Sequence, residues 1–174
     1  MTEYVWVVYA AGFRVSILES KWPALRVAFR GFKLERVARM DSIGRVLKVF
    51  GNTRKARSVV SGARLIAGEG FKAFRRRIGS EGPDGLMELP GIGPITKNHL
   101  ARNIGLAATG KGDIWVARIT KAVGARDWVA MLAFLSKRSR LGPGTVDFIL
   151  WQFCADSAWR GLGYSSFKSY AQSR

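Results

Sequence analysis

Apolar side chains recur every three or four positions along most of the chain, which is the spacing of an amphipathic helix. Residues 42–50 follow this pattern, and Asp41 stands where a helix N-cap is expected. Asn52 or Thr53 can cap the next helix, whose apolar face comprises Ala56, Val59, Val60, Ala63 and Ala67. Asp84 can cap a short turn through Leu86 and Met87, and further helical segments are predicted to open at Asp127 and Thr145. Strict alternation is scarce, so we expect an all-α fold, although residues 4–8 fit a buried helix or a strand equally well.

A glycine-rich turn interrupts the helical pattern within residues 86–105, which we call the hairpin segment. Its centre reads Leu89-Pro90-Gly91-Ile92-Gly93-Pro94. Glycines adopt torsions closed to other residues and let a phosphate approach the backbone, while Pro94 suits the first turn of a helix. A helix from Pro94 to about Ile104 would aim its free N–H groups and positive dipole end at the turn. Such a turn can bind an anion, although a plain helix–turn–helix corner would look similar.

The excess of basic residues in the chain makes this glycine-rich turn a candidate contact with nucleic acid. The chain carries 29 basic and 12 acidic residues, a net charge of +17, yet 48% of it is hydrophobic, which indicates a folded domain with a basic surface. Residues 51–80 hold eight bases and one acid, whereas residues 81–112 hold three of each. Basic side chains of this kind usually lie on a solvated surface. The excess of positive charge nevertheless favours phosphate contacts for some of Arg54, Lys55, Arg57, Arg75, Arg76 and Arg77.

Several classes of protein are excluded or disfavoured. With one cysteine, Cys154, and one histidine, His99, a single chain cannot form an internal disulfide, a four-cysteine iron–sulfur site or a multi-histidine metal site. Cys154 has apolar neighbours and is expected to be a buried thiol. The most apolar run, residues 4–13, is about half the length of a membrane span and lacks a basic leader. We therefore expect a soluble intracellular protein, cytoplasmic or nucleoid-associated, with no membrane partner.

The residues after the hairpin segment narrow the interpretation. Twenty residues after Gly93 the chain reads Asp113-Ile114-Trp115-Val116-Ala117-Arg118-Ile119. The hairpin together with this string resembles the helix–hairpin–helix superfamily of base-excision DNA glycosylases, in which a catalytic aspartate opens a similar Asp-x-x-hydrophobic-x-Arg-hydrophobic pattern. Residues 7–17 and 50–56 resemble the early helix and a later helix start of that family. The resemblance covers roughly residues 5–125.

This resemblance implies roles for individual residues. Asp113 would stabilise the sugar cation formed when a base is released, although an aspartate there also fits a helix N-cap. The hairpin would bind the DNA backbone through Leu89, Gly91, Gly93, Ile95, Thr96 and Lys97. Candidates to stack on a base or fill its vacated position are Phe13, Arg14 and Trp115, for which ordinary packing is the alternative.

The chain also departs from the family pattern. Bifunctional members carry a nucleophilic lysine where this chain has Ile95, and Lys97 lies about 200° further round an ideal helix. The iron–sulfur cysteines are absent. The resemblance therefore implies a monofunctional enzyme without metal or cofactor, with a monovalent cation at the hairpin left open.

We expect residues 1–174 to form one glycosylase-like unit with two helical lobes around a DNA-binding cleft. One lobe would comprise residues 24–110 and the other residues 1–23 together with 111–174. The predicted protein is a monomer that binds double-stranded DNA and hydrolyses the N-glycosidic bond of a damaged, mismatched or modified base. The alternatives are a non-enzymatic helix–hairpin–helix binding module, or a related enzyme that modifies thymine derivatives in phage DNA.

Overall fold

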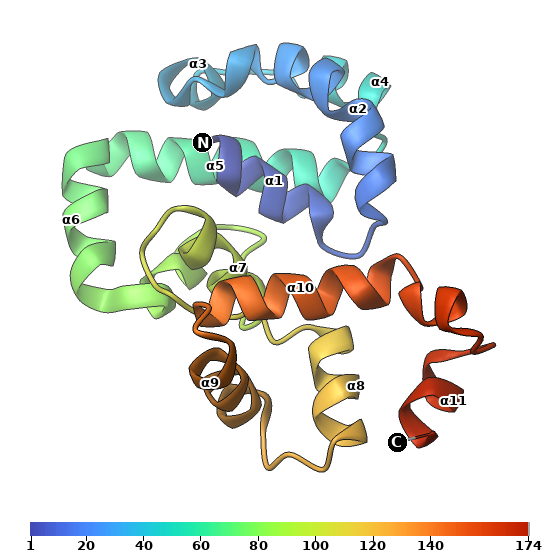
Figure 1. The fold of residues 1–174 in the computed structure, drawn as a ribbon. Coiled ribbons are helices and arrows are strands. Elements are labelled where there is room, and N and C mark those ends of the chain that lie inside the picture. Colours follow the sequence, from blue (N-terminus) through green and yellow to red (C-terminus); the bar gives the residue numbers. More distant parts are fainter. Residues whose placement is uncertain (174) are drawn as a thin grey trace. The chain divides into compact units, whose positions relative to one another are not determined.

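The computed structural model describes residues 1–173, and every regular element in that range is helical (Figure 1). The predicted all-α class is therefore confirmed. None of these helices is both long and apolar enough to cross a membrane. The elements are α1 (Thr2–Ala10), α2 (Val15–Ala28), η1 (Arg30–Phe32), α3 (Leu34–Ala38), α4 (Gly44–Val49), α5 (Thr53–Glu69), α6 (Phe71–Glu81), η2 (Gly82–Glu88), α7 (Thr96–Asn103), α8 (Ile114–Ala122), α9 (Trp128–Ser139), α10 (Pro143–Ala155), η3 (Ala158–Leu162) and α11 (Phe167–Gln172).

The chain divides into two compact units. Unit 1 comprises Met1–Leu106 and unit 2 begins at Ala107. This division differs from the expected grouping, because residues 1–23 belong with the hairpin segment rather than with the C-terminal residues. The physical reason is the packing of α1, which contacts both α5 and α7 within unit 1.

Helix α1 is buried on nearly all of its sides. Val5, Val7 and Tyr9 are fully or almost fully inaccessible to solvent, and the Tyr9 ring makes edge contacts with Phe29 and Phe50. A helix surrounded by protein needs no polar face, which explains why its sequence pattern could not be distinguished from that of a buried strand. The same burial makes α1 the element around which unit 1 is packed.

The hydroxyl group of Tyr4 joins three parts of unit 1. Its single O–H is shared between the carbonyl oxygens of Ser58 in α5, at 2.9 Å, and of Pro90 in the hairpin segment, at 2.6 Å. Gly62 lies beneath the Tyr4 ring, where a side chain would come within 2.3 Å of the hydroxyl oxygen. A glycine inside a helix costs about 1 kcal/mol relative to alanine, and here it makes room for this ring.

Unit 2 has a small core of its own. Val116, Met131, Leu132 and Val146 bring α8, α9 and α10 together. Beside it lies an aromatic cluster in which Trp115 contacts Trp159 and Phe167, linking α8 to η3 and α11.

Two of the helix starts predicted from N-cap residues are confirmed. Asn52 and Asp127 cap α5 and α9 through side-chain oxygens that accept from Lys55 N–H at 3.0 Å and Ala130 N–H at 2.7 Å. Two other starts were wrong by two residues. The Ser42 hydroxyl accepts from Gly44 N–H at the beginning of α4, and α10 begins at Pro143 rather than Thr145.

Replacing Tyr4 with phenylalanine tests the connection between α1, α5 and the hairpin segment. Tyr4→Phe should lower the free energy of unfolding by about 1 to 2 kcal/mol, because the Pro90 carbonyl loses a partly buried donor. Urea denaturation followed by circular dichroism measures the effect. The control Tyr164→Phe removes a hydroxyl that only accepts from exposed Ser173, so equal losses in the two variants would contradict this role of Tyr4.

Candidate nucleic-acid interface and acidic site

The hairpin segment consists of a short 3₁₀ helix, a turn and an α-helix. η2 precedes the turn, and α7 begins at Thr96, two residues later than predicted. Leu89 and Ile92 are buried and anchor the turn in unit 1. Because its side chain is buried, Leu89 can offer a ligand little more than its backbone.

The two hairpin glycines have different structural roles. Gly91 has a φ of 87°, and a side chain there would lie 3.3 Å from atoms of Ser58 and Val8. Gly91 is therefore required both by its torsion and by its contact with α5 and α1. Gly93 does not have a positive φ, and the position where its Cβ would stand faces open space. A large ligand can therefore approach the backbone closely at Gly93.

One backbone donor of the turn is already used within the protein. Gly93 donates its N–H to the Thr96 hydroxyl at 2.7 Å, and Lys97 donates its N–H to the Gly93 carbonyl at 2.9 Å. Within residues 1–173, Ile95 and Thr96 N–H groups donate no hydrogen bond, as expected at a helix start. An anion at this turn would therefore be bound by these two N–H groups rather than by that of Gly93.

Two side chains after Gly93 bear on the expected chemistry. Ile95, which stands where bifunctional glycosylases resembling this chain carry a lysine, is 51% exposed. Lys97 forms an ion pair with Asp84 in η2, and its side chain is mostly buried. The Lys97 charge is thus partly neutralised within the hairpin segment itself.

A shallow groove of about 510 Å³ lies beside the turn, between the hairpin segment and the first turns of α5. Both of its charged lining residues, Arg54 and Arg57, are exposed arginines and had been predicted as phosphate contacts. Arginine donors beside the hairpin turn form a surface suited to phosphate oxygens. The lining residues are Thr53, Arg54, Arg57, Ser58, Ser61 and Pro90.

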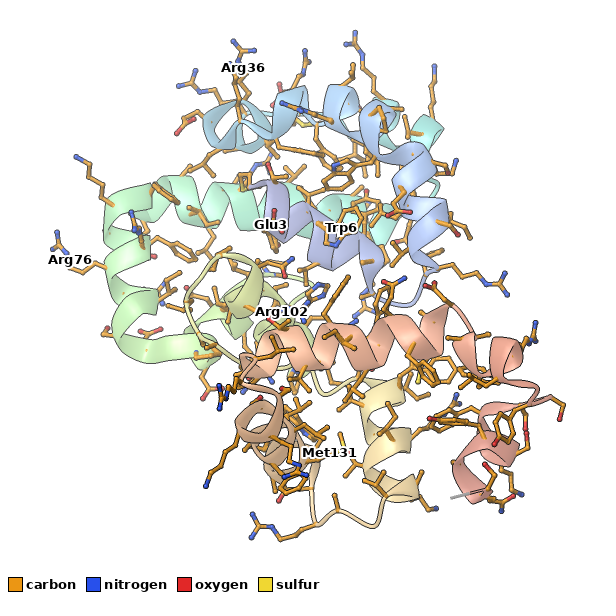
Figure 2. All side chains as sticks on the ribbon, viewed as in Figure 1. Glu3, Trp6, Arg36, Arg76, Arg102 and Met131 are labelled. Carbon is orange, nitrogen blue, oxygen red and sulfur yellow. The ribbon has the colours of Figure 1, made fainter. Side chains whose placement is uncertain are left out.

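Two other bases predicted to contact phosphate have roles inside unit 1. Arg77 pairs with Glu69, Glu81 and Glu88, so its charge is already compensated. Lys55 donates to the carbonyl oxygen of Val8, and to that of Ala11 at 2.7 Å, at the C-terminal end of α1. Arg75 and Arg76 remain exposed, and Figure 2 shows Arg76 extending away from α6.

The environment of Lys55 reflects this structural role. Burial lowers the pKa of its ammonium group, and the neighbouring positive charge of Arg54 lowers it further. The side chain also lies 5.4 Å from the centre of the Phe13 ring. Lys55 therefore caps a buried helix end and supports Phe13, and its contribution to a phosphate-binding surface is indirect.

Asp113 opens α8 in unit 2 and is one of few buried acids. Its side chain is only slightly exposed, at 8% for the residue. Oδ1 accepts from the N–H groups of Trp115 at 2.9 Å and Val116 at 3.3 Å, so the capping role considered from the sequence is confirmed. These bonds fix the carboxylate at the positive end of a helix dipole.

Two residues beside this carboxylate are not predictable from local spacing in the sequence. The ammonium group of Lys111 lies 3.4 Å from Asp113 Oδ2. Burial, together with the negative charge of Asp113, raises the pKa of the Cys154 thiol to about 11. The predicted burial of Cys154 is confirmed, and its thiol stays protonated near neutral pH. Within residues 1–173, no cluster of three or more His, Cys, Asp or Glu side chains could hold a metal ion.

The three candidates for base stacking have different surroundings. Trp115 packs in the aromatic cluster of unit 2, with the Arg118 guanidinium 4.8 Å from its ring centre. Phe13 and Arg14 lie in the exposed loop between α1 and α2. The Phe13 ring is 39% exposed, with its inner edge against Phe50. Phe13 and Arg14 in this loop are therefore freer than Trp115 in α8 to enter a base stack.

No family model matches the sequence, and no curated protein or solved structure matches it at a significant level. The resemblance to helix–hairpin–helix glycosylases therefore stays a prediction from the motifs around the hairpin segment and Asp113.

Lys55→Met tests whether this lysine stabilises the fold or serves only as a basic group on the surface. The substitution should lower the free energy of unfolding by about 1 to 3 kcal/mol, because two carbonyls of α1 lose a charged donor. Urea denaturation at neutral pH measures the change. Arg54→Met is the matched control, since it removes an exposed positive charge next in sequence and should alter stability by less than about 0.5 kcal/mol. Equal stability of the two variants would show that Lys55 does not hold α1.

Proposed function

We propose that this protein is a monofunctional DNA glycosylase that binds double-stranded DNA and releases a damaged, mismatched or modified base. Binding would use the N–H groups of Ile95 and Thr96 together with Arg54 and Arg57 in the adjoining groove. Two exposed arginines and a helix start provide donors for phosphate oxygens of DNA. The open space at Gly93 supports this proposal, since a phosphate could approach the backbone there.

The catalytic part of the proposal rests on the fixed, buried carboxylate of Asp113. Breaking an N-glycosidic bond develops positive charge on the sugar, and a carboxylate next to C1′ stabilises that charge or activates the water that captures it. The N–H groups of Trp115 and Val116 hold Oδ1 in place. Oδ2, which lies near Lys111, would act on the sugar or on water.

The absence of a lysine at position 95 supports hydrolysis without strand cleavage. A lyase reaction needs an amine that attacks C1′. Ile95 has none, and Lys97 is paired with Asp84. Water is then the nucleophile, the base leaves, and the products are a free base and an intact strand with an abasic site. Extrusion of the base costs a few kcal/mol, and Phe13 or Arg14 would occupy the gap.

A DNA-binding module without enzymatic activity is the second candidate. The capping hydrogen bonds of Asp113 favour it, because they are by themselves a sufficient reason for an aspartate at the start of α8. The two functions predict different products from the same DNA.

Incubation with a panel of duplexes distinguishes these functions. Each duplex carries one damaged, mismatched or modified base, and chromatography with mass spectrometry follows the base and the strand. We expect free base from at least one duplex, together with an intact abasic strand. Binding without any release would favour the non-enzymatic module. A mass change with the base retained would favour an enzyme that modifies thymine derivatives.

Asp113→Asn tests the carboxylate directly. Asparagine is also a good N-cap, so folding and DNA affinity should be preserved, whereas base release should slow by about 100-fold or more. The matched control is Asp127→Asn, which removes the same charge from the cap of α9 and should leave release unchanged. Normal release by Asp113→Asn would disprove the catalytic assignment.

A further inference from the structure

A second basic groove lies in unit 1, away from the hairpin segment. It has a volume of about 580 Å³, which is within the range of small-molecule sites. Four exposed arginines contribute to it from η1, from α3 and the residue that follows it, and from α4, with Asp41 as the one acid among the lining residues. The lining residues are Ala28, Arg30, Arg36, Arg39, Met40, Asp41, Ser42 and Arg45.

An unusual backbone conformation positions the first of these arginines. Arg30, Gly31 and Phe32 are three consecutive residues with positive φ angles, of 55°, 74° and 56°. Each non-glycine residue in this conformation costs roughly 1 to 2 kcal/mol. Burial of the Phe32 ring, whose centre lies 4.8 Å from that of Trp22, offsets part of this cost. The strained turn therefore holds Arg30 at the edge of the groove.

Arg64 of α5 fixes the other side of the groove. Its Nε donates to the Ala38 carbonyl at 3.0 Å, and Nη2 donates to the Met40 carbonyl at 2.7 Å. These bonds satisfy carbonyls at the C-terminal end of α3, which have no partners within the helix. The backbone that carries Arg36 and Arg39 is thereby attached to the longest helix of unit 1.

The four groove arginines differ from Arg64 and Arg77 in having no partner within the described residues 1–173. None of the four guanidinium groups donates a hydrogen bond or forms an ion pair there. Figure 2 shows Arg36 extending from α3 away from the rest of unit 1. Four like charges brought together repel one another, so a site of this kind is stabilised by a polyanion.

The groove and the hairpin segment lie on different sides of α5. Arg64 and the α3 contacts mark one side of this helix, while Ser58 contacts Gly91 on the other. Figure 1 shows α2, α3 and α4 on one side of α1 and α5, and α7 on the opposite side. DNA is stiff over about 150 base pairs, so a short duplex bound at the hairpin cannot also follow the arginine groove.

We propose that the groove formed by Arg30, Arg36, Arg39 and Arg45 is a second DNA-binding site, which binds the phosphates of another duplex. Guanidinium groups bind phosphate oxygens in a bidentate manner. A membrane surface is the less favoured partner, because the apolar lining residues Ala28 and Met40 are buried and cannot insert into lipid. Binding at this site does not depend on base release. It requires only that the groove contact the backbone of a nucleic acid.

The test counts duplexes bound to one protein chain. Native mass spectrometry with 20-base-pair duplexes should detect one chain carrying two duplexes. At concentrations where the unmodified chain carries two duplexes, the groove variant Arg30→Gln/Arg36→Gln/Arg39→Gln/Arg45→Gln should carry only one. Its second dissociation constant should rise about tenfold or more, and the salt slope of that step should fall by roughly 3 to 4, since each lost phosphate contact removes about 0.9.

A control variant removes the same charge elsewhere. Lys121→Gln/Lys137→Gln/Arg138→Gln/Arg140→Gln neutralises four exposed bases of unit 2 and should keep the second duplex. Equal weakening in both variants, or a second duplex held by the groove variant, would overturn the proposal. Binding of the groove to phosphatidylserine vesicles, with the duplex stoichiometry unaffected, would also overturn it.

A further variant separates this proposal from the proposed function. Arg54→Gln/Arg57→Gln should retain one duplex, bound at the arginine groove, and should lose it when the four groove substitutions are added. If only the groove substitutions weaken DNA binding, the proposed hairpin interface is disproved and the proposal of a second site at the arginine groove is supported. If two duplexes bind but no base is released from any substrate, the proposed catalytic activity is disproved, while the proposed second DNA-binding site is supported.

Discussion

The burial of α1 is the constraint on which the rest of unit 1 depends. A helix enclosed by protein cannot leave its terminal carbonyls to water, and an unsatisfied buried carbonyl costs about 1 to 3 kcal/mol. Lys55 satisfies the carbonyls of Val8 and Ala11, and Tyr4 connects the same helix to Ser58 and Pro90. Because Pro90 opens the glycine turn, the conditions that allow α1 to be buried also position the proposed phosphate-binding backbone.

The positive charge of the chain is divided between structural and available residues. Lys55, Arg64 and Arg77 use their donors on carbonyls or on glutamates of unit 1. The arginines that line the two grooves have no such partners among residues 1–173 and project from the surface. Only the latter are available for the proposed phosphate contacts. The net charge of +17 therefore overstates the number of basic side chains that are available to an anionic partner.

Asp113 has a structural role as an N-cap and a proposed catalytic role in the same side chain. As an N-cap it stabilises α8, and the same hydrogen bonds prevent its carboxylate from rotating. Catalysis by electrostatic stabilisation benefits from groups that are fixed before the reaction begins. A capping aspartate is thus a suitable position for such a group, and its burial near Lys111 and Cys154 distinguishes it from Asp127, which caps α9 in a more exposed setting.

The sequence by itself determined the features that arise from residues three or four positions apart. The all-α class and the caps at Asn52, Asp113 and Asp127 follow from such local spacing. Tertiary structure decided features set by residues far apart in the chain. It settled whether residues 4–8 form a helix, and it assigned Lys55 and Arg77 to internal partners. It also brought four arginines together in one groove, from η1, from α3 and the residue that follows it, and from α4. Local pattern determines which face of a helix is apolar, but only long-range packing determines which charges are consumed inside the protein and which remain free to meet a partner.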